Sequence, residues 1–114
     1  MAALTLLDQA QTVLNGDSAA RNRMACWIAR AALEEAVRAR LAEKGRPAGT
    51  GSMRSLLTCF EVAYADDPLL VDDAEYSWAG LSNACHHHAF ELGPTATEAQ
   101  RLIDAVRRVA ATPT

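Results

Sequence analysis

The sequence predicts an all-α protein, an up-and-down bundle of four to five helices in a single domain that spans residues 1–114. Alanine, the best helix former, fills 24 of the 114 positions. Valine and isoleucine together fill only eight, which leaves few β-branched residues from which to build a sheet. Glycine and proline divide the chain into segments of helical length.

Composition also excludes several classes of protein. Half of the residues are hydrophobic and 22% are charged, which is typical of a folded domain and not of a disordered chain. No run of 18 apolar residues occurs, so we expect neither a membrane span nor a membrane partner. The segment Met1–Asp8 has no basic region before its apolar stretch, which argues against a secretory signal. Three cysteines without a CxxC pair favour reduced thiols and a cytoplasmic location.

The first helix is expected at Ala2–Leu14, with Leu4, Leu7 and Leu14 in the core. The tripeptide Asn15-Gly16-Asp17 follows it. We interpret its glycine as the C-cap of this helix and its aspartate as the N-cap of the next.

The second helix is expected from Ser18 to Lys44, with a stop at Gly45-Arg46-Pro47. Its first half, residues 24–29, is apolar almost all round, which predicts a central, buried position. Its second half is charged and should project toward solvent (Glu34, Glu35, Arg38, Arg40, Glu43, Lys44).

The remaining chain contains signals for three further helices. A helix over Met53–Ala65 should end before Pro68. The next should begin near Asp72 or Asp73, whose carboxylates can cap free amides, and reach Leu92 before Gly93-Pro94. The last has the capping-box spacing Thr95-x-x-Glu98 and should run to Ala110.

Charge is distributed unevenly along the chain, although the net charge is −3. Residues 21–54 carry eight Arg or Lys against three Glu, a local +5, whereas residues 55–100 carry eight Asp or Glu and no Arg or Lys. One interpretation is two complementary surfaces that help the helices to pack. The other is a basic strip for RNA or another anion, which a pI near 5.5 does not favour.

All three histidines are adjacent, at residues 86–88. Neighbouring residues on a helix point about 100° apart, so the three cannot bind one metal ion. We therefore examine each face of the expected helix. One face is a core stripe of Trp78, Leu81, Cys85, His88 and Leu92. A second face is a polar row of Asn83, His87 and Glu91, in which Glu91 can hold the His87 ring and Asn83 can bind a ligand oxygen. A third face contains Ser82 and His86.

A metal site would need ligands from other helices. Cys85 and His88 with Cys26 or Cys59 would make a plausible zinc set. The alternative is a buried thiol and a hydrogen-bonded core imidazole, and this is the interpretation we adopt. The sequence therefore predicts no metal and no cofactor.

The stretch Leu81–Phe90 resembles the motif of the HEPN family, which is an arginine, a polar residue and, a few residues later, a histidine, often followed by a tyrosine. In one register Ser82 takes the arginine position, Asn83 the polar position and His87 the histidine. In the other, Asn83 takes the arginine position, His88 the histidine and Phe90 the tyrosine. HEPN domains are four- or five-helix bundles, usually homodimeric, and many are metal-independent RNases of toxin–antitoxin systems.

The sequence departs from this motif because the arginine is missing in both registers. In the family the histidine acts as acid and base on the ribose 2′-hydroxyl, and the arginine steadies the phosphate. Without a cation, a phosphate transition state loses much of its electrostatic stabilisation. Arg23 or Arg30 of the second helix could supply it, and Arg54 is a weaker candidate.

The resemblance implies a HEPN-like homodimer that acts as a non-catalytic binding module for RNA or a cognate partner protein. The first alternative is a metal-independent endoribonuclease with His87 or His88 as acid and base. In either case the binding residues are expected among Ser82, Asn83, His86, Glu91, Arg23 and Arg30. The second alternative is a helical ligand- or metal-binding protein unrelated to HEPN domains.

Overall fold

A computed structural model of the chain describes residues 2–46, 51–86 and 93–111. These ranges contain helices and no strand, so the all-α fold class is confirmed. The helices are α1 (Ala2–Leu14), α2 (Arg21–Glu43), α3 (Met53–Ala63), α4 (Pro68–Cys85) and α5 (Ala96–Ala110). None of the helices in the described ranges is long and apolar enough to cross a membrane.

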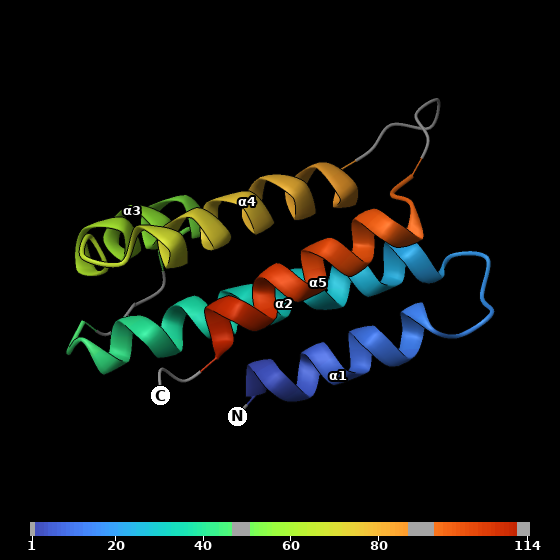
Figure 1. Cartoon of the computed structure of the whole chain (residues 1–114), viewed down its shortest axis with the longest axis horizontal. Helices are drawn as coiled ribbons and strands as arrows, with labels where there is room; N and C mark the ends of the chain where they lie inside the picture. Colours follow the sequence, from blue (N-terminus) through green and yellow to red (C-terminus); the bar gives the residue numbers. More distant parts are fainter. Residues whose placement is uncertain (1, 47–50, 87–92, 112–114) are drawn as a thin grey trace.

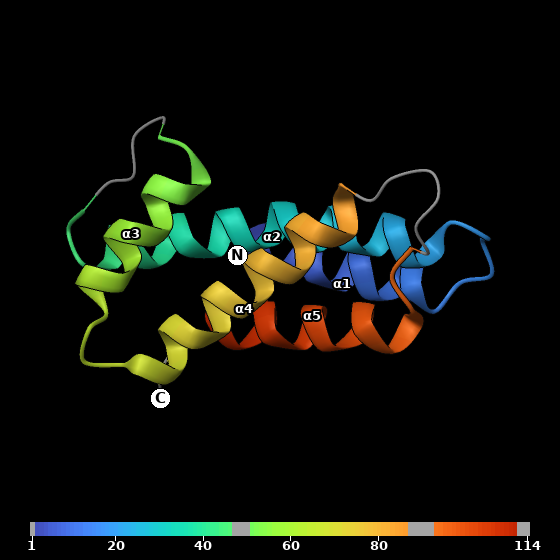
Figure 2. The same ribbon diagram turned by 90° about the horizontal axis from the view of Figure 1, so that it is seen from above.

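The long helices alternate in direction. α1 and α4 run one way, and α2 and α5 run the other way (Figure 1). α2 and α5 contact each other along the middle of the bundle, while α1 covers one face of this pair and α4 covers the other (Figure 2). The short helix α3 packs against α2 and α4. α2 is therefore the central helix, because it contacts all four others.

Two predicted helix boundaries are confirmed by their cap hydrogen bonds. Gly45 has a φ of 70° and follows the C-cap of α2. Its amide donates to the Ala42 carbonyl at 3.0 Å, and the Arg46 amide donates to the Leu41 carbonyl at 2.9 Å, which is the Schellman pattern. At the start of α5, the Glu98 amide donates to Thr95 Oγ at 3.0 Å, as the capping-box spacing predicts.

The predicted junction between the first two helices is wrong. Among the described glycines only Gly45 has a positive φ, so Gly16 is not a left-handed C-cap. Asp17 does not cap α2 either, because that helix begins at Arg21 after an N-cap, Ala20, without a side-chain hydrogen bond. Ser18 Oγ instead accepts from the Ala20 amide at 3.2 Å, so a local turn occupies the residues assigned to the helix start.

α4 also differs from its prediction at both ends. It begins at Pro68, where the Asp67 side chain accepts from the Leu70 amide at 3.3 Å, and not at Asp72 or Asp73. A proline fits the first helical position because its missing N–H would have no intrahelical partner there. α4 ends at Cys85 with His86 as the C-cap, short of the predicted end at Leu92. Residues 87–92 lie outside the described part.

The core fills the space between the helices. Three predictions of which residues are buried or exposed are wrong. Leu7 and Leu14 are buried as expected, but Leu4 is 40% exposed. In the first half of α2, Met24 and Trp27 are 46% and 49% exposed, so this segment is not buried all round. One strip of α2 stays open to solvent between its neighbouring helices.

The third correction concerns Arg40, which was expected to point into solvent and is only 6% exposed. Its Nε donates to the Val109 carbonyl at 2.8 Å, and Nη2 donates to the Ala111 carbonyl. These acceptors lie at the C-terminal end of α5, where carbonyls lack partners within the helix. The hydroxyl of Tyr64 donates to the Arg40 carbonyl at 2.7 Å, which ties the end of α3 to the same place.

We expect Arg40→Ala to lower the free energy of unfolding by about 3 kcal/mol, because buried α5 carbonyls would lose their donors. Arg38→Ala is the matched control. Arg38 lies on the same helix and pairs with exposed Glu34 at 3.0 Å in a partly exposed position, so its loss should cost less than about 1 kcal/mol. Urea denaturation measures both values. Equal effects of the two substitutions would contradict the structural role of Arg40.

Candidate functional site

Arg30 of α2 lies against the last two turns of α4. Its Nη1 is 3.2 Å from Nε2 of His86. The guanidinium carbon is 5.1 Å from the centroid of the Trp78 ring and 5.8 Å from that of the Trp27 ring. The structure thus brings together one cation, one imidazole and two indole rings.

Helical spacing explains how these side chains meet. Trp27 lies three residues before Arg30, so both occupy one face of α2. Trp78 and Cys85 are seven residues apart and share one face of α4, which packs against α2. His86 is the C-cap of α4, where the helix dipole is negative and favours a nearby cation.

The charge of Arg30 has no acidic partner in the described ranges. The ion pairs found there use Arg38, Arg40, Arg107 and Arg108. Arg30 instead contacts aromatic faces, whose negative π clouds attract a cation. Because a guanidinium has five N–H donors and the described contacts of Arg30 use few of them, it retains the capacity to bind an anion.

Polar oxygens near this end of the bundle also lack partners. Ser82 Oγ and Asn22 Oδ1 are shielded from solvent and form no hydrogen bond within the described residues. Ser82 lies one turn before His86 on the same side of α4. Asn22 holds the beginning of α2 against the segment before α5, because its Nδ2 donates to the Pro94 carbonyl at 3.1 Å.

The cysteines differ in their surroundings, and all three are free thiols. Cys26 is fully buried on α2, and burial raises its pKa to about 11, with further contributions from Cys85 and Glu98. Burial also raises the pKa of Cys85, although the charge and a hydrogen bond of Arg30 oppose this change. Cys59 is exposed on α3.

The zinc set considered from the sequence is not assembled in the described part. There, no three His, Cys, Asp or Glu side chains come close enough to hold a metal ion. Cys59 lies on α3, whereas Cys26 and Cys85 lie on α2 and α4. His88, the remaining ligand of that set, is outside the described residues.

Of the site residues proposed from the sequence, Arg30 and His86 are in contact, and Ser82 lies one turn from His86. Asn83 is exposed and lines a pocket on the α5 side of the same helix, and Arg23 is exposed near the start of α2. His87, His88 and Glu91 lie outside the described residues.

The sequence analysis did not predict that the two tryptophans contact Arg30. Trp27 was assigned to a buried segment and Trp78 to a core stripe, yet both contact Arg30. The signal that could have found Trp27 is its position one helical turn before an arginine.

Comparisons of the chain with protein-family models, with curated proteins and with solved structures found no match. The resemblance to HEPN domains therefore stays a prediction that depends on the residues of the Leu81–Phe90 stretch.

We expect iodoacetamide at pH 8 to modify Cys59 much faster than Cys26 in the folded protein. The thiolate is the reactive form, and both the raised pKa and the full burial of Cys26 suppress its reaction. Mass spectrometry of tryptic peptides over time measures both rates, and a urea-unfolded sample is the control in which the rates should converge. Equal rates in the folded protein would contradict the burial of Cys26.

The raised pKa of Cys26 also predicts how stability depends on pH. The Cys26 thiol has a pKa near 11 in the folded state and an ordinary pKa of 9.0 in the unfolded state, so it stays protonated to a higher pH when the protein is folded. Its contribution to stability is therefore complete below pH 9 and is lost as the pH rises toward 11. Urea denaturation from pH 7.5 to 11 should show a steeper loss of stability for the wild type than for Cys26→Ala. Equal slopes would contradict this assignment.

Proposed function

We propose that the protein is a non-catalytic binding module, a HEPN-like helical homodimer that binds single-stranded RNA through the surface around Arg30. The observation that carries this proposal is an arginine that has no acidic partner among the described residues and that contacts two tryptophan rings and an imidazole. This surface also includes Trp27, which is half-exposed.

These groups match the chemistry of a nucleotide. A guanidinium binds a phosphate through parallel N–H donors. Trp27 is 49% exposed, so its side chain is accessible to a base, and stacking of bases on aromatic side chains is tolerant of sequence. The segment 21–54, which includes Arg30, has a local charge of +5, from eight Arg or Lys against three Glu.

The contact between Arg30 and His86 argues against His86 as an acid or base. An arginine N–H only donates, so the 3.2 Å contact is a hydrogen bond in the tautomer of His86 whose Nε2 accepts. A nitrogen whose lone pair is already engaged by a cation is a poor proton acceptor for a ribose hydroxyl. His86 therefore helps to place Arg30 and is not proposed as an acid or base.

We expect Arg30→Gln to weaken binding of a fluorescent single-stranded RNA at least about tenfold, because it removes the phosphate partner. Trp27→Ala should weaken it by a similar factor through lost stacking. Arg54→Gln on α3 is the matched charge control and should change the affinity less than about twofold. Fluorescence anisotropy at two salt concentrations measures these effects. Equal losses for Arg30→Gln and Arg54→Gln would show general charge attraction and refute the site.

The homodimer is tested separately. Light scattering at micromolar concentration should give twice the chain mass of 12.2 kDa. A monomer at that concentration would refute the dimeric part of the proposal and leave the RNA measurement unaffected.

A second candidate function is a metal-independent endoribonuclease with His87 or His88 as acid and base. One observation favours it: the cation Arg30 contacts His86, the residue directly before His87 in the sequence. Cleavage of a mixed RNA pool in EDTA, lost in His87→Ala or in His88→Ala, would establish this activity. Binding without cleavage would support the non-catalytic module.

A further inference from the structure

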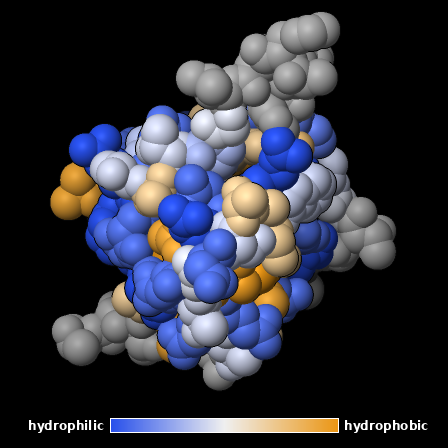
Figure 3. All heavy atoms as spheres, turned by 90° about the vertical axis from the view of Figure 1, so that its right-hand side faces the viewer, coloured by the Kyte–Doolittle hydropathy of each residue, from blue (hydrophilic) through white to orange (hydrophobic). Residues whose placement is uncertain are grey.

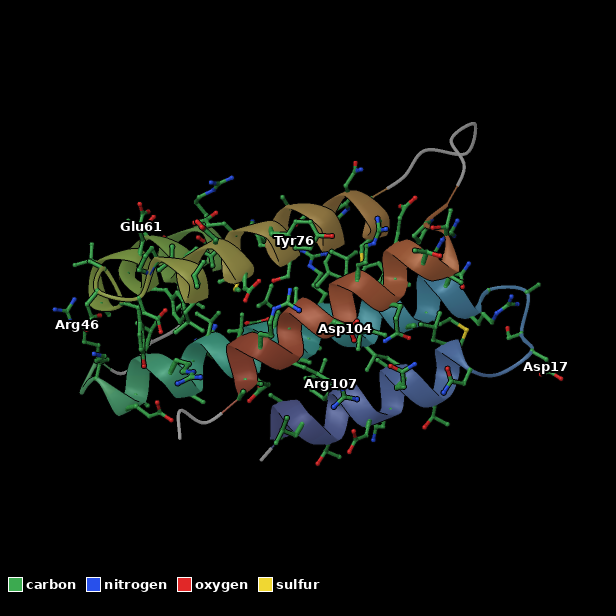
Figure 4. All side chains as sticks on the ribbon, viewed as in Figure 1. Asp17, Arg46, Glu61, Tyr76, Asp104 and Arg107 are labelled. Atoms are coloured by element: carbon green, nitrogen blue, oxygen red, sulfur yellow. The ribbon has the colours of Figure 1, made fainter. Side chains whose placement is uncertain are left out.

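A pocket of about 780 Å³ lies between α4 and α5, on the opposite flank of α4 from Arg30. Trp78 and Cys85 face α2, whereas Tyr76 and Asn83 lie on the flank toward α5, where Figure 4 labels Tyr76. Its lining residues come from α4, from the segment before α5 and from α5 itself, and Figure 3 shows hydrophobic patches among hydrophilic side chains at the end of the bundle where α4 ends and α5 begins. Its volume is within the range of small-molecule sites.

Small residues of α4 form part of the pocket wall. Gly80 lets α4 and α5 approach closely, because a Cβ at this position would lie 2.5 Å from Cδ2 of Leu102. Ala79 and Ala84 line the pocket beside it and leave room that larger side chains would fill. The apolar part of the lining therefore suits a flat or compact hydrocarbon body.

The polar part of the lining has one ionised side chain among the described residues, the carboxylate of Glu98. The backbone amide of Glu98 is bound by Thr95, but its carboxylate forms no ion pair or hydrogen bond within those residues. The Tyr76 hydroxyl and the Asn83 amide likewise form no hydrogen bond there. These three groups are therefore available to a ligand.

We infer that this pocket binds a small organic amine. The protonated amine would pair with Glu98, the apolar body would lie against Gly80 and Leu102, and Asn83 or Tyr76 would bind a second polar group. An anion is disfavoured because the only charge in the described lining is negative and residues 55–100 contain no Arg or Lys. A metal ion is disfavoured because a single carboxylate provides too few ligands.

This inference is independent of the proposed RNA site, because the two surfaces lie on different flanks of α4. Titration of the full-length, 15N-labelled chain with 2-phenylethylamine tests it by heteronuclear NMR. We expect saturable shifts at the amides of Gly80, Asn83 and Glu98. The neutral isostere 2-phenylethanol should bind at least about fivefold more weakly, since it lacks the charge that pairs with the carboxylate.

Three substitutions separate the contribution of the Glu98 charge to amine binding from that of the space in the pocket. Glu98→Gln keeps the capped amide at the start of α5 and should remove the preference for the amine over the alcohol. Glu61→Gln on α3 carries the same charge change away from the pocket and should leave the preference intact (Figure 4). Ala79→Trp, at an exposed position of α4, should block both compounds, and its amide spectrum shows whether the fold is retained.

Three results would overturn the inference: no saturable shift with the amine, shifts centred on Trp27 and Arg30 instead of the pocket, or an amine preference that survives Glu98→Gln. Loss of RNA binding in Arg30→Gln without any effect on the amine would show that the two sites act separately.

Discussion

α2 contacts all four other helices of the described structure, and this constraint determines how the bundle is built. A helix with so many neighbours must let them approach its backbone closely. Ala25, Ala29, Ala32 and Ala36 satisfy this requirement, because each is fully buried and adds little bulk. Small side chains also bury little apolar area each, so the fold depends on larger residues such as Leu7, Leu33 and Phe60 and on well-satisfied helix ends.

Two arginines of α2 lie at the C-terminal ends of neighbouring helices, and they differ in how many of their hydrogen-bond donors are used. Arg40 is buried, and the carbonyls at the end of α5 accept its hydrogen bonds. Arg30 is half-buried at the end of α4, where its partners are an imidazole, two indole rings and a thiol. The first arginine is satisfied by the fold, which makes it structural. The second keeps donors that its contacts with the described residues leave unused.

Local signals in the sequence were sufficient for the fold class and for the helix ends that depend on them. Gly45 and the Thr95–Glu98 pair act through neighbouring backbone groups, so their spacing alone predicts them. Leu4 and Arg40 could not be placed in this way, because their burial depends on which faces of α1 and α2 meet other helices. Hydrophobicity describes a side chain, whereas burial is a property of the packed bundle.

The candidate site was predictable only in part, for a related reason. The missing cation of the motif pointed to an arginine of α2, and Arg30 does reach α4. The choice between Arg23 and Arg30 required the register between the two helices, which no local pattern contains. The same register places Trp78 against Arg30 and leaves Trp27 half-exposed.

α4 separates two surfaces of opposite charge, and this arrangement explains why one small domain can present both. Its α2 flank faces the cation Arg30, and its α5 flank faces the carboxylate of Glu98. Buried Cys26 lies near both flanks, because Cys85 and Glu98 both contribute to its raised pKa. A neutral thiol between them adds no charge of its own. The packed core of α2 and α4 therefore keeps the charges of Arg30 and Glu98 apart, so neither neutralises the other.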